Sequence, residues 1–127
     1  MIGSTRALRV FAYGAPADLR KGFDGLSALV VGSLGRDPLS GECFLFTSRT
    51  RTRAKVLHYD GTGLCLYHKR LEAGRFACLW ERAEGGSIEL TLSELALYLE
   101  GSRLVGKVAL SPRKISPKVL AEKRRTA

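Results

Sequence analysis

The hydrophobic and polar positions near the start of the chain predict a strand followed by a helix. Residues 7–14, ALRVFAYG, form a short β-branched and aromatic run closed by glycine, which is typical of a strand. Apolar residues then recur three or four apart from residue 19 to residue 34, the spacing of one helical face. The pattern predicts one long N-terminal helix over 19–34, preceded by Pro16 and Asp18 and ended by Gly35.

The middle of the chain changes to the spacing of strands. Four short runs rich in aromatic and β-branched residues, separated by Arg-rich or glycine-bearing turns, span residues 42–49, 54–60, 63–70 and 74–80. The DGTG sequence at 60–63 is typical of a tight hairpin, because Asp-Gly tolerates positive φ. Since each link is too short for a crossover helix, these runs predict an antiparallel meander.

The last patterned segments predict one more strand and a second, shorter helix. SIEL, residues 87–90, fits a strand, and TLSELALYLEG fits a helix with Thr91 or Ser93 as N-cap and Gly101 as its end. Beyond Gly101 the periodicity fades. We therefore expect a single α+β domain over residues 1–101, in which a mostly antiparallel meander packs against the long N-terminal helix, followed by a basic, flexible tail over residues 102–127.

Composition limits the class of protein. A chain of 127 residues with 45% hydrophobic residues is long and apolar enough to fold as one domain. It contains neither an apolar run long enough to span a bilayer nor the pattern of a signal peptide, so we expect a cytoplasmic protein without a membrane partner. The three cysteines include no CxxC pair, which argues against a disulfide framework or a zinc knuckle.

The charge is strongly positive and unevenly distributed. The net charge is +9, and the segment after Gly101 carries eight Lys and Arg residues against one acid. A second group of seven cations lies between residues 49 and 75, where the acids are Asp60 and Glu72. Two basic zones predict a polyanionic partner, most commonly nucleic acid, although a basic surface can also serve solubility alone.

The sequence TSRTRTRAK, residues 47–55, is the sharpest local feature. Its cations alternate with Thr and Ala, so an extended segment would present all four on one face and could follow DNA phosphates. Charges that protect an exposed strand are the alternative. We take as candidate DNA-binding residues Arg49, Arg51, Arg53, Lys55, Lys69, Arg70 and Arg75, helped by Arg20 and Lys21.

Two glycines within one turn of the expected helix, just after a basic pair, form a candidate interaction surface. Gly22 and Gly25 lie three apart, and each costs about 0.5–1 kcal/mol relative to alanine. Close approach of another backbone would explain them. The sequence leaves open whether that backbone is a sheet of the same chain, a partner subunit or a sugar-phosphate strand.

Catalytic motifs are missing from the sequence. The acids are scattered, and there is no GxSxG, HExxH or phosphate-binding glycine loop. His58, Cys65 and His68 could meet across the DGTG hairpin to form a metal site, but isolated strand histidines and apolar cysteines need no ligand to explain them. We predict a protein that is not an enzyme and has no cofactor or metal.

Several sequence blocks carry a family resemblance. PADLRKGFDGLSALV, DGTGLCLYHKRLEAGRF and LTLSELALYLEG occur in order between Val10 and Gly101. They resemble the small TnpB accessory protein of the insertion sequence sixty-six transposon family, which is unrelated to the RNA-guided nuclease of the same name. The resemblance implies an accessory factor that works beside a larger transposase, with DNA binding and without catalytic residues of its own. The segment after Gly101 does not match, so its role is not carried over.

Together these features predict a non-catalytic accessory protein of DNA transposition that binds DNA, expected to be double-stranded, through basic strand and loop residues. The alternative is a protein-interaction adaptor that docks onto the transposase without touching DNA, using the glycine surface and exposed aromatic side chains. The sequence leaves homo-oligomerisation open.

Overall fold

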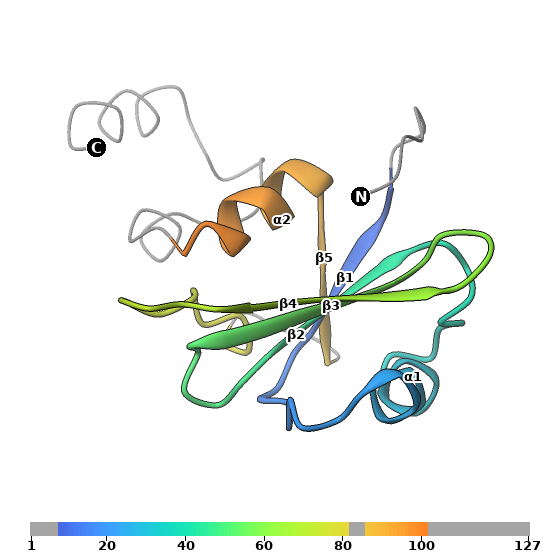
Figure 1. Ribbon diagram of the computed structural model, residues 1–127, viewed down its shortest axis with the longest axis horizontal. Helices are drawn as coiled ribbons and strands as arrows, with labels where there is room; N and C mark the ends of the chain where they lie inside the picture. Colours follow the sequence, from blue (N-terminus) through green and yellow to red (C-terminus); the bar gives the residue numbers. More distant parts are fainter. Residues whose placement is uncertain (1–7, 82–85, 102–127) are drawn as a thin grey trace.

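The computed structural model describes residues 8–81 and 86–101, which form five strands and two helices (Figure 1). In chain order the elements are β1 (Val10–Tyr13), α1 (Phe23–Gly32), β2 (Cys43–Thr47), β3 (Arg53–Tyr59), β4 (Leu64–Arg70), β5 (Ser87–Leu90) and α2 (Leu92–Leu99). The α+β composition agrees with the prediction, but the arrangement of the sheet and the length of the first helix do not. The expected tail lies outside the described residues.

The sheet is mixed, which corrects the predicted meander. Its strand order is β4-β3-β2-β1-β5. The antiparallel pairs β2–β3 and β3–β4 form the expected meander core, but β1 pairs with β2 in parallel and with β5 antiparallel. The parallel pair arises because the connection from β1 to β2 contains α1 and is long enough for a crossover.

Helix α1 is shorter than the predicted helix over residues 19–34. The carboxylate of Asp18 accepts the backbone N–H of Arg20 at 3.0 Å, so the preceding residues form a separate turn. Gly22 is extended, with φ −98° and ψ −151°, and serves as the N-cap. The helix therefore begins one turn late, at Phe23, and it ends before Gly35, whose φ of +63° fits the predicted stop.

The two helices cover opposite faces of the sheet (Figure 1). Side chains alternate between these faces along each strand, so each face has its own apolar cluster. The α1 face is built from Leu26 and Val30 together with Phe11, Phe44, Phe46 and Leu57. The α2 face is built from Leu95 and Tyr98 together with Val10, Leu45, Val56, Phe76 and Leu79.

The prediction of a strand over residues 74–80 is wrong. This stretch has no regular structure, and it buries Phe76 and Leu79 beneath α2. The N–H of Phe76 donates to the carbonyl of Arg51 at 2.7 Å, and that of Leu71 donates to Thr52 at 2.8 Å. These two backbone hydrogen bonds hold residues 71–76 against the turn between β2 and β3. The N–H groups of Leu71 and Phe76 are thus satisfied without strand pairing.

Two local predictions are confirmed. The N–H of Asp60 donates to the Gly63 carbonyl at 3.1 Å and closes the β3–β4 hairpin, and its carboxylate accepts three bonds from Thr62 and Gly63. Backbone bonds from Thr62 and Gly63 lower the pKa of Asp60 to about 2. Helix α2 begins with a capping box, in which Thr91 and Glu94 bond each other's backbone N–H.

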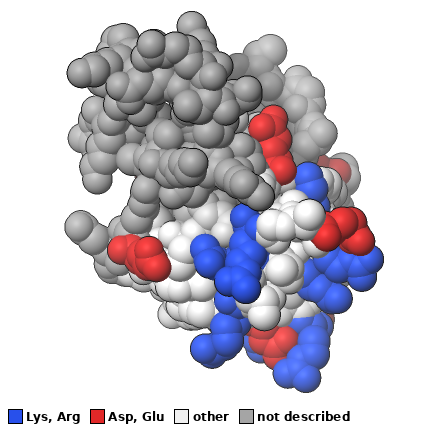
Figure 2. Space-filling model, turned by 90° about the vertical axis from the view of Figure 1, so that its left-hand side faces the viewer, with Lys and Arg blue, Asp and Glu red and all other residues white. Residues whose placement is uncertain are grey.

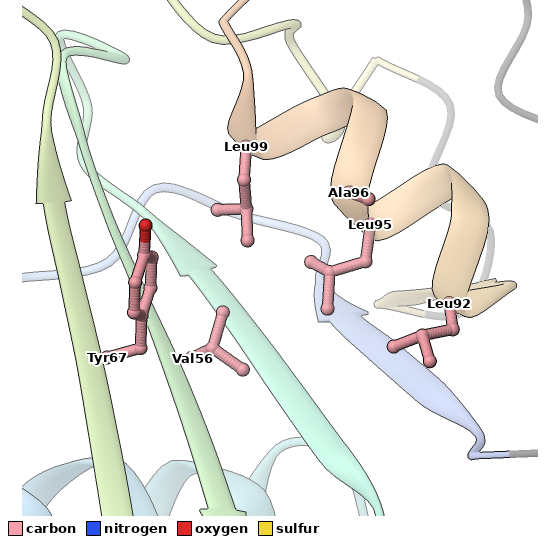
Figure 3. A pocket seen from close by; sticks show the side chains of 6 residues that line it. All are labelled: Val56, Tyr67, Leu92, Leu95, Ala96 and Leu99. Atoms are coloured by element: carbon pink, nitrogen blue, oxygen red, sulfur yellow. The ribbon is translucent and has the colours of Figure 1, made fainter. Parts of the chain in front are cut away.

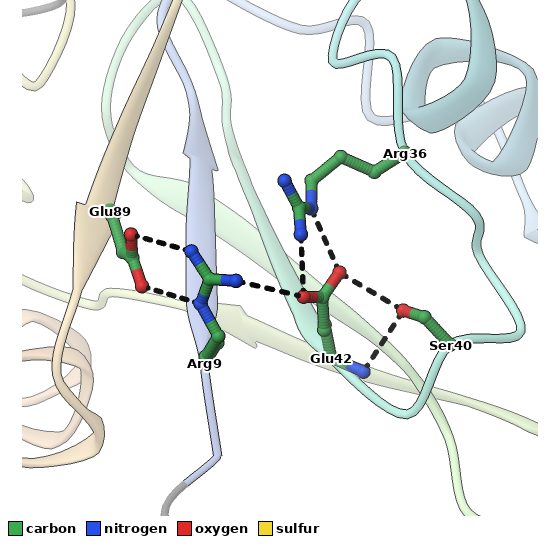
Figure 4. A network of polar contacts seen from close by, with 5 residues as sticks. All are labelled: Arg9, Arg36, Ser40, Glu42 and Glu89. Atoms are coloured by element: carbon green, nitrogen blue, oxygen red, sulfur yellow. Dashed lines mark hydrogen bonds and ion pairs between the residues drawn. The ribbon is translucent and has the colours of Figure 1, made fainter.

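A polar network around Glu42 joins the start of β1, the connection before β2 and β5 (Figure 4). Arg36 donates two bonds to the Glu42 carboxylate at 2.8 and 2.7 Å. Arg9 pairs with Glu89 at 2.8 and 3.0 Å and lies 3.9 Å from Glu42. The hydrogen bond from Arg36 lowers the pKa of Glu42, and the one from Arg9 lowers the pKa of Glu89.

We expect Glu42→Gln to lower the free energy of unfolding by about 1–3 kcal/mol at neutral pH, because Arg36 loses a charged acceptor in a half-buried site. Since the folded-state pKa of Glu42 is lowered, its contribution is present above the ordinary carboxylate range and disappears as the pH falls through that folded pKa. Urea unfolding at neutral and acidic pH measures this difference. Glu72→Gln, at an exposed ion pair, is the control and should change little. An equal effect of Glu42→Gln at both pH values would contradict the assignment.

Candidate nucleic-acid interface

Six of the predicted DNA-binding residues meet at one end of the sheet. The turn between β2 and β3, the end of β4 and the segment that follows β4 are joined there by the bonds from Leu71 and Phe76 to that turn. In the register of β3 and β4, Arg53 lies opposite Arg70. We call this the sheet-end basic surface, and it consists of Arg49, Arg51, Arg53, Lys69, Arg70 and Arg75.

The sheet-end basic surface has little acidic compensation. Figure 2 views the left-hand side of Figure 1, and Lys and Arg side chains gather there with a few acidic side chains between them. Among the described residues, the ion pair at this surface is Arg70 with Glu72 at 3.0 Å, and both side chains are exposed. An exposed pair of this kind contributes little, so the surface keeps a positive excess.

The cations of residues 47–55 do not share one strand face, which corrects the predicted alternation. Residues 49–52 form a turn, and β3 begins only at Arg53. Arg51 has a φ of +61°, and its guanidinium donates to the carbonyl of Phe76 at 3.4 Å. The cations gather because the turn folds onto the segment after β4. The predicted extended strand is therefore not the cause of their proximity.

Lys55 lies away from this surface. Its side chain is 9% exposed on the α1 face of β3, and its Nζ donates to the backbone carbonyl of Lys21 at 3.0 Å. This bond holds the turn before α1, which contains Arg20 and Lys21, against the sheet. Arg20 itself pairs with Asp18 at 2.9 Å.

A histidine that the sequence analysis did not assign to DNA lies opposite Lys55. The register pairs Lys55 with His68, so Arg53, Lys55, His68 and Arg70 share the α1 face. Burial and the positive charges of Lys55, Arg53 and Arg70 lower the pKa of His68. The sequence does contain an indication of this cluster. The DGTG hairpin pairs the two strands and so brings Lys55 and His68, thirteen positions apart, together.

The two glycines are placed differently from each other. Gly22 is exposed at the N-cap of α1, and a Cβ there would have open space around it. A Cβ on Gly25 would lie 2.9 Å from the Cβ of Lys21. The nearest atoms at Gly25 therefore belong to the Lys21 side chain, and close helix-to-sheet packing does not explain Gly22.

The histidines and cysteine considered as a metal site do not converge. His58 is buried on the α2 face, with its Nδ1 3.5 Å from the Sγ of Cys43. Cys65 lies opposite His58, whereas His68 is on the other face of the sheet. Burial raises the pKa of Cys43 to about 11, so its thiol stays protonated at neutral pH. In residues 8–81 and 86–101, no three His, Cys, Asp or Glu side chains are grouped to hold a metal ion.

An apolar pocket of about 260 Å³ lies between α2 and the β3–β4 side of the sheet (Figure 3). Tyr67 from β4 and Leu92 from α2 are 49% and 44% exposed at this pocket. We call it the α2 groove, and it is lined by Val56, Tyr67, Leu92, Leu95, Ala96 and Leu99. The sequence analysis missed this feature, although Leu92, Ala96 and Leu99 have the spacing of one helical face.

The comparison with protein families decides the identity of the chain. Residues 8–108 match the family model described as IS66 Orf2 like protein. The chain belongs to the IS66 Orf2-like family. This confirms the resemblance drawn from the sequence and makes the protein a member of a family of transposition-associated accessory proteins that is not known as catalytic.

Two relatives of this IS66 Orf2-like protein come from Sinorhizobium fredii (strain NBRC 101917 / NGR234). Uncharacterized protein y4jC is 33% identical over 119 residues, covering 91% of this chain and all of the relative. Uncharacterized protein y4hO is 39% identical over 101 residues, covering 80% of this chain and 86% of the relative. No solved structure matches the chain. Neither helix of the described part is long and apolar enough to cross a bilayer.

Proposed function

We propose that this IS66 Orf2-like protein assists transposition by binding double-stranded DNA through the sheet-end basic surface, beside a transposase that performs the chemistry. The observation that carries the proposal is that six cations from three separate segments lie at one end of the sheet, with Arg53 and Arg70 on the α1 face and Lys69 on the α2 face. Among the described residues, the ion pair at this surface is that of Arg70 with Glu72, so most of its like charge is uncompensated. A polyanion that spans the surface would relieve it.

The chemistry of the surface suits a phosphate backbone. Five of its six cations are arginines, whose planar guanidinium groups bond phosphate oxygens in pairs. Most of these side chains lie in turns and at strand ends, where they can follow a curved backbone. Each phosphate that they neutralise releases counterions, so the affinity should depend steeply on salt.

The proposal is tested by fluorescence anisotropy with the full chain. A duplex carrying the end of the element and a scrambled duplex of equal length are titrated over a range of salt concentrations. We expect log Kd to change linearly with log salt, with a slope of about 0.9 per phosphate contact. Preference for the element end would add sequence recognition. Absence of binding at low salt would refute the proposal.

A second candidate function is an adaptor that docks onto the transposase without touching DNA. The α2 groove favours it, because Tyr67 and Leu92 expose apolar surface beside a pocket. An apolar segment of the transposase is the occupant that this candidate requires. In this arrangement the transposase would hold the DNA by itself.

We expect Leu92→Ser to weaken capture of the purified transposase at least tenfold if the adaptor candidate holds, because the change places a hydroxyl in the apolar groove. Leu97→Ser is the matched control, since Leu97 is on the same helix and is 48% exposed but does not line the groove. Pull-down with each variant, after its fold is checked by circular dichroism, measures the effect. Equal capture by both variants would exclude the groove as the docking site.

A further inference from the structure

Lys55 is a buried cation without a matching anion. Its side chain is 9% exposed, and its ammonium donates to the carbonyl of Lys21. Among the described residues no carboxylate lies within 4.0 Å of it. An ammonium has three donors, and burial of an unpaired charge is unfavourable. The site therefore has unused capacity for a negatively charged acceptor.

The side chains around Lys55 increase this positive charge. Arg53 lies opposite Arg70 on the same face, and His68, whose pKa is lowered by burial and by these cations, lies opposite Lys55 as a mostly neutral hydrogen-bonding group at neutral pH. Like charges opposite each other destabilise a strand pair. His68, Arg53 and Arg70 are exposed, so the cluster is open to solvent above the buried Lys55.

The start of α1 adds a further feature that suits an anion. The carbonyl that holds Lys55 belongs to Lys21, which directly precedes the N-cap Gly22. Gly22 has no side chain to accept the N–H groups of the first turn, and the space above it is open. Free N–H groups and the helix dipole favour negative charge at such a position, where Asp24 in the first turn supplies one carboxylate.

We propose that Arg53, Lys55, His68 and Arg70, together with the N-terminus of α1, form an anion seat that holds one phosphate group. This inference rests on the proposed function and deepens it, because it assigns to the seat one phosphate of the bound DNA backbone. The seat lies on the α1 face, beside the sheet-end basic surface, and shares Arg53 and Arg70 with it. A free phosphate ion has the same chemistry, so the test separates the two sources.

The first arm of the test uses inorganic phosphate as the probe. Lys55→Met is compared with Lys69→Met in the full chain, because both remove one ammonium from the β3–β4 hairpin but Lys69 lies on the α2 face. Thermal unfolding is followed in phosphate and in sodium chloride of equal ionic strength. We expect phosphate to raise the Tm of the wild type and of Lys69→Met beyond chloride, with no such rise for Lys55→Met. In chloride, Lys55→Met should be at least as stable as the wild type.

A second variant keeps the test decisive if Lys55→Met does not fold. His68→Glu places a carboxylate opposite Lys55 and so supplies the missing anion within the chain. We expect it to raise the Tm in chloride and to abolish the response to phosphate. Two outcomes would contradict the anion seat. One is a wild-type Tm that responds equally to phosphate and chloride, and the other is a response to phosphate that persists in both variants.

The second arm measures duplex DNA binding by the same variants. We expect Lys55→Met to weaken binding about tenfold and to lower the salt slope by about one contact, with a smaller loss for Lys69→Met. A phosphate response with no loss of DNA affinity in Lys55→Met would overturn the DNA backbone as its source. If the wild type does not bind DNA at all, the proposed function fails, and the phosphate titration still decides whether the seat exists.

Discussion

Replacing Arg49, Arg53 and Arg75 together by alanine should weaken duplex DNA binding by about a hundredfold or more and lower the salt slope by two to three contacts. These arginines come from the turn before β3, from its first residue and from the segment after β4. All three are exposed, so their loss should leave the fold intact. Arg51 is left unchanged because its backbone and guanidinium both bond Phe76. Anisotropy titrations at several salt concentrations measure the effect.

The matched control removes the same charge from another part of the chain. Lys118, Lys123 and Arg124, all C-terminal to Gly101, are replaced by alanine in the full chain. If the sheet-end basic surface holds the DNA, this control should lose much less affinity than the variant of the surface. Equal losses would mean that net charge, and no particular surface, governs binding.

The largest effect on stability is expected at Tyr98. Its ring is fully buried and stacks on Phe76 at a centroid distance of 5.1 Å, and its hydroxyl bonds the hydroxyl of Thr47. Tyr98→Ala removes this packing and leaves a cavity beneath α2. It also removes the hydrogen-bond partner of the buried Thr47 hydroxyl. We expect a loss of about 3–5 kcal/mol, a large part of the stability of a domain of this size. Urea unfolding followed by circular dichroism measures it.

Leu97→Ala serves as the control for Tyr98→Ala, because Leu97 is on the same helix and about half exposed. It should change the free energy of unfolding by only a small fraction of the loss at Tyr98. A similar loss in both variants would show that helix α2, and not the buried ring, limits stability.

The sequence predicted the elements of the fold better than their arrangement. The hairpin at Asp60 and the cap at Thr91 were found because turn and cap chemistry is local. The parallel pairing of β1 with β2 was missed because a hydrophobic pattern does not specify which distant strands are neighbours. The predicted first helix is too long because the apolar spacing includes Leu19, where Asp18 instead closes a separate turn.

The sequence predicted most of the residues of the candidate site but not how they are arranged in space. The alternating sequence predicts an extended strand, but Arg51 adopts a positive φ and turns the chain. The alternation predicts that Lys55 shares one face with the other cations, yet its neighbours Ala54 and Val56 belong to the centre of a buried strand. Contact between Lys55 and Lys21 depends on the packing of α1 on the sheet, which no local pattern contains.

The crossover from β1 through α1 to β2 also determines when the anion seat exists. Strands β2, β3 and β4 are consecutive and joined by tight turns, so their side chains meet early in folding. Lys21 and Lys55 are 34 residues apart, and they meet only after that long loop has closed and α1 has docked. We therefore expect the arginines of β3 and β4 to gather before the seat is complete, with α1 docking after the rate-limiting step of folding. A phosphate held in the seat should then slow unfolding more than it speeds folding.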